Sequence, residues 1–309
     1  MKRFLFAMLL TLSLAIPASA AKKVVFVAGN KSHGYGSHEH KAGCMLLAKL
    51  LNEGLGDKIE TKVVTNGWPK DESVFEVADA IVIYSDGGGR HPIMRNLKSF
   101  NALVKKGVSV GCIHYGVEVP RGSGGKAMIA ATGGFFETNW SVNPHWKTTN
   151  VTLAKDNPVT RGVQPYEMQD EWYYHMRFPG QMKGVTPILS ALPPKSTLAR
   201  KDGAHSGNPH VRKAVAAGEI QHLMWAFERD DKSRGFGFTG GHFHWNWGHP
   251  MHRKVVLNGV AWIAGIDVPK DGVPAGKLTL DNLKANQDYT PKANYKFDNI
   301  QKNLDAWQK

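Results

Sequence analysis

Histidines are the residues with the clearest chemical potential in this chain, and they gather in four short stretches. The sequence holds 14 histidines. Most of these histidines come directly after an apolar run, in stretches that also contain glycine and charged residues. They and their charged neighbours are His33, His38, Glu39 and His40, then Asp86, Arg90 and His91, then His114 and Glu118, and finally His242, His244 and His249. Imidazole binds metals and transfers protons near neutral pH, so a shared site for one of these chemistries is expected.

Four of these histidines are candidate ligands for a divalent metal ion such as zinc. They are His38, His40, His114 and His242, which lie far apart in the sequence and must converge from separate loops. A catalytic zinc site needs three protein ligands and one open position. The chain has no His-Glu-x-x-His motif, so spacing alone does not identify a metal site. Direct contact with substrate without a metal stays open, and no nucleotide cofactor is expected.

Two carboxylates are candidates for proton transfer beside His114, which we take as catalytic. Glu118 follows His114 by four residues, so a helix starting at His114 would place both side chains on one face. Glu171 alternates with Tyr173 in an extended segment, which puts them on the same side. Either carboxylate could also complete a metal site. The predicted catalytic residues are therefore His114, Glu118 and Glu171.

Aromatic residues near these motifs suggest a sugar ligand. Trp140, Trp146, Trp172, Trp245 and Trp247 all stand beside polar residues. Flat rings can stack on the C–H face of a pyranose while polar groups bind its hydroxyls, although core packing is the alternative for each tryptophan. The predicted substrate-binding residues are Asp86, Arg90, Trp140, Asn143, His145, Tyr173 and His244.

Alternating strands and helices must position these side chains. Strands are predicted at 23–28, 59–64, 80–84, 108–114, 220–227 and 235–239, and helices at 42–51, 93–106 and 250–264. Continuous apolar runs are typical of strands covered on both faces. The order predicts an α/β fold with a doubly wound, mostly parallel sheet and helices on both faces. Ligands of such sheets bind at the carboxyl ends of the strands, where the histidines lie.

The middle and the end of the chain are less regular. Residues 133–217 are rich in Trp, Pro, Asn and Gly, and we expect extended segments and long loops there, with strands at 145–153, 169–176 and 187–192. The α/β domain is predicted to span 21–268. Residues 269–309 are polar and weakly periodic, so a tail that packs on the domain or is partly mobile is expected.

The strand that ends at His114 resembles the nucleophile turn of class I glutamine amidotransferases. In residues 111–116 the nucleophile's place is taken by His114, while Cys112 lies two residues earlier and about 6–7 Å deeper along the strand. That family also needs a His-x-Glu pair, and residues 241–244 lack the glutamate. A cysteine-dependent hydrolase is therefore disfavoured. Cys44 and Cys112 form either one disulfide or two buried thiols.

The pattern as a whole resembles the ThuA-like family, named for trehalose utilisation. The resemblance implies an amidotransferase-like fold and a role in carbohydrate metabolism. It also implies oxidised (keto) sugars as substrates, and so a hydrolase, lyase or isomerase rather than a glutamine amidotransferase. A carbohydrate-binding protein without catalysis is the alternative. The matching segments are 32–40, 86–89, the turn at His114, 139–146, 170–174, 239–243 and 258–262, within residues 23–265.

The first twenty residues have the order of a secretory signal peptide. Two basic residues precede the apolar run 4–16, and the small residues 18–20 follow. Cleavage near Ala20 and a periplasmic or secreted protein are expected, without stable membrane insertion. The net charge is +13, but the basic residues are scattered along the chain, so we attribute the charge to solubility. Binding of an acidic carbohydrate is the alternative explanation. No nucleic-acid partner is expected, and the oligomeric state does not follow from the sequence.

Overall fold

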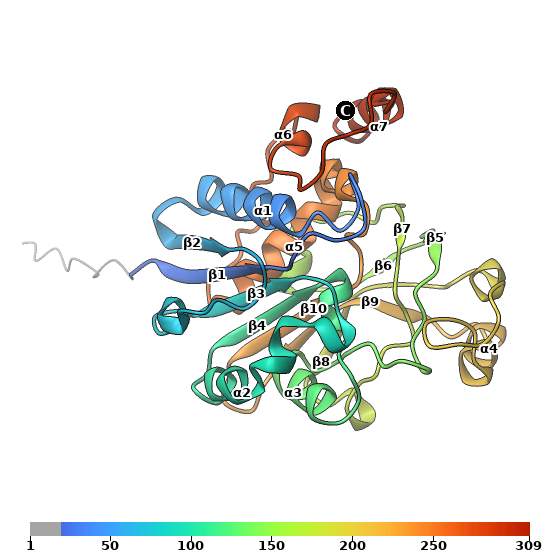
Figure 1. The fold of residues 1–309 in the computed structure, drawn as a ribbon, viewed down its shortest axis with the longest axis horizontal. Coiled ribbons are helices and arrows are strands. Elements are labelled where there is room, and N and C mark those ends of the chain that lie inside the picture. Colours follow the sequence, from blue (N-terminus) through green and yellow to red (C-terminus); the bar gives the residue numbers. More distant parts are fainter. Residues whose placement is uncertain (1–19) are drawn as a thin grey trace, which may run out of the picture.

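An eight-stranded, mostly parallel sheet forms the centre of the computed structural model, which describes residues 20–309 (Figure 1). The predicted signal peptide falls almost wholly outside these residues. The strand order is β2-β1-β3-β4-β10-β9-β8-β6, and the first five strands are parallel while the last three run antiparallel to their neighbours. The strands are β1 (Lys22–Ala28), β2 (Ile59–Val64), β3 (Ala80–Tyr84), β4 (Ser109–Ile113), β6 (Thr152–Leu153), β8 (Val185–Ala191), β9 (Gln221–Glu228) and β10 (Arg234–Phe238).

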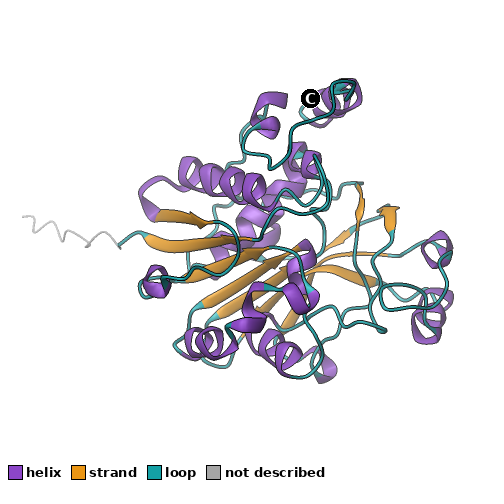
Figure 2. Ribbon diagram, in the orientation of Figure 1, coloured by secondary structure: helices purple, strands orange, loops and turns teal. Residues whose placement is uncertain are grey.

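Helices cover both faces of this sheet, which confirms the predicted doubly wound α/β fold (Figure 2). On one face lie α1 (His40–Leu55) and α5 (Pro250–Ile263), and on the other lie α2 (Leu97–Lys105) and α3 (Ser123–Thr132). Successive residues of the central strands enter two separate cores, as a period of two residues requires. This double cover explains why β3 and β4 are fully buried and almost wholly apolar.

Two helices of the predicted α/β domain (21–268) were not predicted, and one predicted helix begins differently. The α3 segment was missed because Gly124 and Gly125 lower helix propensity. A Cβ at Gly125 would lie 2.6 Å from the Phe135 ring, so the close approach of this helix requires glycine there. The second missed helix, α4 (Pro209–Ala216), lies in the stretch predicted as loops. The segment predicted to be helical from residue 93 starts with a 3-10 turn at Pro92–Arg95 before α2.

The long strands predicted at 145–153 and 169–176 are confirmed only in part. The first segment divides into β5 (His145–Lys147) and β6, which joins the edge of the main sheet, and the second keeps only β7 (Gln169–Glu171). Strands β5 and β7 pair in a separate two-stranded sheet. The same register returns at an isolated bridge between Val142 and Tyr174. Between the two lies Pro144, which has no backbone N–H to donate, so the ladder is interrupted there.

The last forty residues pack on the domain beside α1. They contain α6 (Leu280–Lys284) and α7 (Asp298–Trp307), seen at the top of Figure 1. The backbone N–H of Asp288 donates to Glu39 just before α1, and Lys41 pairs with the Asp288 carboxylate at 2.7 Å. The tail thus contacts the loop that leads into α1. Across residues 20–309, no helix combines the length and the apolar character needed to span a membrane.

The two cysteines are free and lie in different cores. Cys44 on α1 and Cys112 on β4 are both fully buried, on opposite faces of the sheet. Burial raises the pKa of both thiols well above their usual range, which disfavours the nucleophilic thiolate. Of the two alternatives for the cysteines, the structure shows the pair of buried thiols.

Candidate functional site

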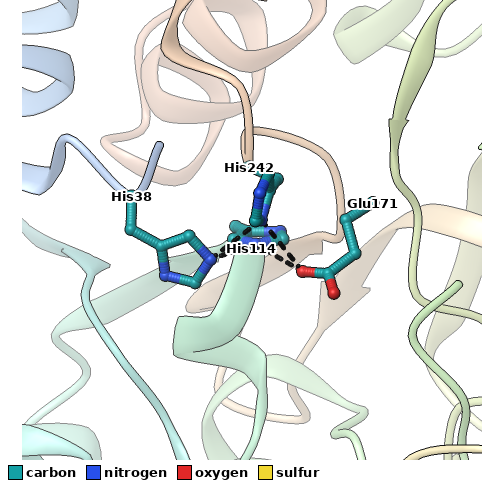
Figure 3. Close-up of side chains that lie close together, drawn as sticks. All are labelled: His38, His114, Glu171 and His242. Carbon is teal, nitrogen blue, oxygen red and sulfur yellow. Dashed lines mark hydrogen bonds and ion pairs between the residues drawn. The ribbon is translucent and has the colours of Figure 1, made fainter. Parts of the chain in front are cut away.

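Four side chains from four separate segments meet at the carboxyl edge of the sheet (Figure 3). His38 comes from the loop after β1, His114 directly follows β4, His242 follows β10, and Glu171 ends β7. Each offers one nitrogen or oxygen atom, and these four atoms all lie within 4.8 Å of one another. The structure thus brings together three of the four predicted metal ligands and one predicted catalytic carboxylate.

The contacts inside this cluster are short. His38 Nε2 lies 3.0 Å from His242 Nδ1 and 3.1 Å from His114 Nε2. Glu171 Oε2 lies 3.0 Å from His242 Nδ1 and 3.4 Å from His114 Nε2. The three histidines are buried, and the Glu171 side chain is 13% exposed. Four polar atoms therefore face one small volume that is largely shielded from water.

Outer contacts fix which nitrogen of two of these histidines carries the hydrogen. His114 Nδ1 lies 2.9 Å from the Thr239 carbonyl oxygen, and His38 Nδ1 lies 2.9 Å from Asp86 Oδ1. A carbonyl and an ionised carboxylate can only accept, so each Nδ1 donates. In a neutral ring with this tautomer, Nε2 turns a lone pair toward the cluster. Two such lone pairs 3.1 Å apart need a proton or a metal cation between them.

The electrostatics agree with the assignment for His38. Burial raises the pKa of Asp86, but the hydrogen bonds from His38 and Ser32 outweigh it and lower the pKa to about 2. Burial lowers the pKa of His38 to about 2, so its ring is neutral at physiological pH. Burial opposes ionisation of Glu171 too, yet the contacts with His114 and His242 hold its pKa below the usual range. The cluster therefore contains a neutral imidazole and an anionic carboxylate.

Two histidines of the cluster hold strained backbone conformations. His38 has φ 50° and His114 has φ 53°, in the left-handed region that residues other than glycine rarely adopt. Such residues cost about 1–3 kcal/mol each and gather at functional sites, where the surroundings hold them in place. At His114 the chain leaves β4 in a 3-10 turn, and a Cβ at Gly116 would lie 3.0 Å from the Ile83 carbonyl oxygen. Tight packing thus fixes the direction of the His114 side chain.

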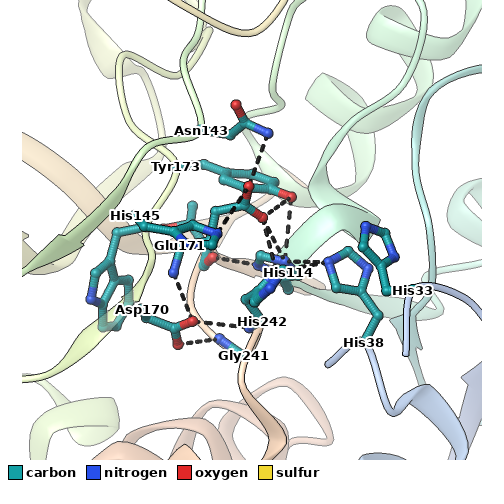
Figure 4. Close-up of polar contacts among 12 residues, drawn as sticks. His33, His38, His114, Asn143, His145, Asp170, Glu171, Tyr173, Gly241 and His242 are labelled. Carbon is teal, nitrogen blue, oxygen red and sulfur yellow. Dashed lines mark hydrogen bonds and ion pairs between the residues drawn. The ribbon is translucent and has the colours of Figure 1, made fainter. Parts of the chain in front are cut away.

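The two acidic residues of β7, Asp170 and Glu171, point to opposite sides of the strand and make different contacts (Figure 4). Glu171 enters the cluster, whereas Asp170 is fully buried and accepts the backbone N–H groups of Gly241 at 2.7 Å and His242 at 3.1 Å. These charge-assisted hydrogen bonds hold the loop that carries His242. The sequence shows both acids, but their opposite roles depend on the side of the strand that faces the loop.

Three predicted substrate-binding residues surround Glu171. The Tyr173 hydroxyl lies 3.3 Å from both His114 Nε2 and Glu171 Oε2, and Asn143 Nδ2 donates to Glu171 Oε1 at 3.2 Å. His145 Nε2 lies 3.7 Å from the same oxygen. Asn143, His145 and Glu171 line a hollow of about 330 Å³. The hollow meets the cluster at Glu171, whose Oε2 contacts His114 and His242.

The prediction that Glu118 stacks above His114 is wrong. The turn after β4 is a short 3-10 turn rather than an α-helix, and Glu118 continues in extended backbone. Its carboxylate instead lies 3.0 Å from His205 Nε2, and this hydrogen bond raises the pKa of His205. His205 was not predicted, because its loop has no pattern that reports its path.

Two further candidate histidines have no ligand atom in the cluster. His40 Nδ1 bonds the Asn30 carbonyl, and its Nε2 lies 3.7 Å from Asp86 Oδ1. His244 is fully buried, and neither ring nitrogen has a hydrogen-bonding side chain within residues 20–309. His33, by contrast, stacks on His38 with ring centroids 3.5 Å apart. Asp86 and Arg90 line a second hollow next to the cluster.

The tryptophans do not form a sugar-stacking surface at the cluster. Trp140 is covered by His210, whose ring centroid lies 4.2 Å away, and by the Arg177 guanidinium at 3.6 Å. The other four, Trp146, Trp172, Trp245 and Trp247, are buried among core side chains. Ionisable and amide groups therefore dominate the site.

Comparisons with known proteins agree with this fold. The sequence model of the ThuA family, described as trehalose utilisation, matches residues 23–263. The crystal structure of a ThuA-like protein from Bacteroides uniformis ATCC 8492 is similar with a TM-score of 0.55 at 16% identity, over 82% of this chain and 95% of that one. One from Parabacteroides merdae ATCC 43184 gives 0.52 at 16%, over 85% and 99%. At this identity the likeness shows the fold alone. No curated protein matches the chain.

The contact between Asp170 and the His242 loop gives a testable prediction. Asp170→Asn places an amide N–H₂ or a neutral oxygen against backbone donors, so the free energy of unfolding should fall by about 2–3 kcal/mol. Urea unfolding measures this change. The matched control is Glu167→Gln, which removes an exposed carboxylate paired with Lys147 and should change stability by less than about 0.5 kcal/mol. Equal stability of Asp170→Asn and the parent would refute the assigned role.

Proposed function

Since the chain belongs to the ThuA family, described as trehalose utilisation, we propose that it is a metal-dependent enzyme that acts on carbohydrate. The observation that carries the proposal is the meeting of one ligand atom each from His38, His114 and His242, beside Glu171, all within 4.8 Å of one another. A divalent cation is the simplest partner for these atoms. The proposed reaction is cleavage or rearrangement of an oxidised (keto) sugar or glycoside, by a hydrolase, lyase or isomerase.

The donor set suits zinc or a similar ion. Tetrahedral zinc with nitrogen ligands at 2.0–2.1 Å places neighbouring ligand atoms about 3.3 Å apart. Four of the six separations between ligand atoms are close to this value, and all six are within 4.8 Å. They are 3.0 Å for His38–His242, 3.1 Å for His38–His114, 3.0 Å for His242–Glu171 and 3.4 Å for His114–Glu171. Small side-chain movements would therefore accommodate an ion. Imidazole is a ligand that zinc prefers, and three imidazoles leave the open position that a catalytic zinc site needs.

We assign the three histidines to the ion and place Glu171 toward the substrate. When bound, such an ion polarises a carbonyl or hydroxyl oxygen. Glu171 is anionic and receives hydrogen bonds from Asn143 and Tyr173, so it is oriented to accept a proton from carbon or from a hydroxyl. The hollow beside it offers Asn143 and His145 to sugar hydroxyls.

The structure favours this proposal over a carbohydrate-binding protein without catalysis. Such a protein would be expected to present exposed aromatic rings at the cluster, whereas the five tryptophans predicted for the site are covered or buried. The cluster instead joins ionisable groups to strained backbone at His38 and His114. We further propose that the protein works in the periplasm or outside the cell, after removal of residues 1–20.

Metal content tests the assignment of the histidines. The purified protein, loaded with zinc and desalted, should retain about one equivalent per chain, measured by mass spectrometry of the metal. His114→Ala should lose it, because one of the three imidazole ligands is removed. His210→Ala is the matched control, since His210 stacks on Trp140 and should leave the metal in place. Absence of retained zinc in the parent, or full retention by a folded His114→Ala variant, would contradict the assignment.

Proton exchange tests the role of Glu171. With a panel of keto glycosides in D₂O, NMR should show exchange of the hydrogen next to the carbonyl or breakdown of the glycoside. Glu171→Gln should slow this reaction by about 10²-fold or more, because the amide cannot accept the proton. Glu167→Gln should react like the parent. Unchanged rates in Glu171→Gln would show that another group moves the proton.

A further inference from the structure

A second hollow lies on the far side of Asp86 from the histidine cluster. Its volume is about 420 Å³, and its walls come from the loops that follow three neighbouring strands. These are residues 29–31 after β1, 66–68 after β2 and 85–96 after β3. The chain leaves β1 toward β2 and leaves β3 in the opposite direction, toward β4. The loops diverge at such a switch point and leave a crevice that suits a ligand.

Positive charge dominates this hollow. Lys31, Arg90 and Arg95 line it and are exposed, and none of them pairs with a carboxylate within residues 20–309. The only carboxylate in the wall is Asp86, whose Oδ1 is bound by His38. Cations without protein partners in a concave surface raise the local concentration of anions. The hollow is therefore built for a negatively charged group.

The remaining wall suits the polar and apolar parts of a sugar. Asn30 and Asn66 are exposed amides that can bind hydroxyls. Trp68 contributes part of its indole, which Phe75 supports with ring centroids 4.7 Å apart and Glu72 holds through the indole N–H. Such a combination of amides, a ring and guanidinium groups can hold a pyranose that carries a charge.

Asp86 joins this hollow to the histidine cluster. The same carboxylate lines the hollow and accepts from His38 Nδ1 at 2.9 Å, and His33 lies beside both. We propose that the hollow binds the anionic substituent of the substrate, a carboxylate or a phosphate, so that the substrate is an acidic sugar. This inference rests on the proposed function for the reaction, but the binding of the anion does not require the metal.

Direct binding measurements test the inference. Calorimetry would compare D-glucuronate, D-glucose 6-phosphate and neutral D-glucose with the zinc-loaded protein. At least one acidic sugar should bind at least about tenfold more tightly than glucose, and the tighter of the two shows whether carboxylate or phosphate is preferred. In Arg90→Gln/Arg95→Gln that acidic sugar should bind at least about tenfold more weakly, while glucose is unaffected. Lys98→Gln, an exposed cation of α2 outside the hollow, is the control and should bind like the parent.

The outcomes separate this inference from the proposed function. Zinc retained with no preference for the acidic sugars would overturn the acidic-sugar inference and leave the metal site standing. Tight binding of an acidic sugar that needs both arginines, in a protein that retains no zinc, would support the anion site while the metal proposal fails. Equal affinity of the double variant and the parent for the acidic sugar would overturn the assignment to this hollow.

Discussion

The arrangement of the site depends on two imidazole nitrogens, from His38 and His114, that face each other. His38 and His114 each commit Nδ1 to an acceptor, the Asp86 carboxylate and the Thr239 carbonyl, so both Nε2 atoms face inward 3.1 Å apart. In a buried volume, two such nitrogens need a proton or a metal cation between them. Glu171 adds a negative charge to the same point. The surroundings thus keep the cluster ready for a cation.

The rest of the fold supplies the restraint that this arrangement needs. Parallel strands deliver the loops of His38, His114 and His242 to one edge, and Asp170 fixes the His242 loop from behind. The His38 N–H also donates to the His242 carbonyl, which ties the two loops together. The C-terminal tail also contacts this region: the side-chain oxygen of Gln287 accepts a hydrogen bond from the backbone N–H of Gly36, close to His38 in the sequence. Contacts between segments distant in sequence therefore stabilise the strained backbone conformations of His38 and His114.

The sequence could predict the sheet and the edge of the site, but not the identity of every side chain in it. A continuous apolar run indicates a strand that helices cover on both faces, so the strand that leads to His114 could be located from the sequence. The choice of His38 over His40 depends on a left-handed residue in an irregular loop, which no periodicity reports. Glu118 was misplaced because the turn after β4 is 3-10 rather than α-helical. Glu171 differs from Asp170 only by the side of a three-residue strand.

The most direct test of the central claim is a crystal structure of the zinc-loaded protein with diffraction data on both sides of the zinc absorption edge. The account predicts one strong anomalous peak about 2.0–2.2 Å from His38 Nε2, His114 Nε2 and His242 Nδ1. A peak elsewhere would contradict it. So would a fully loaded crystal with no peak and with water or a direct hydrogen bond between the His38 and His114 rings.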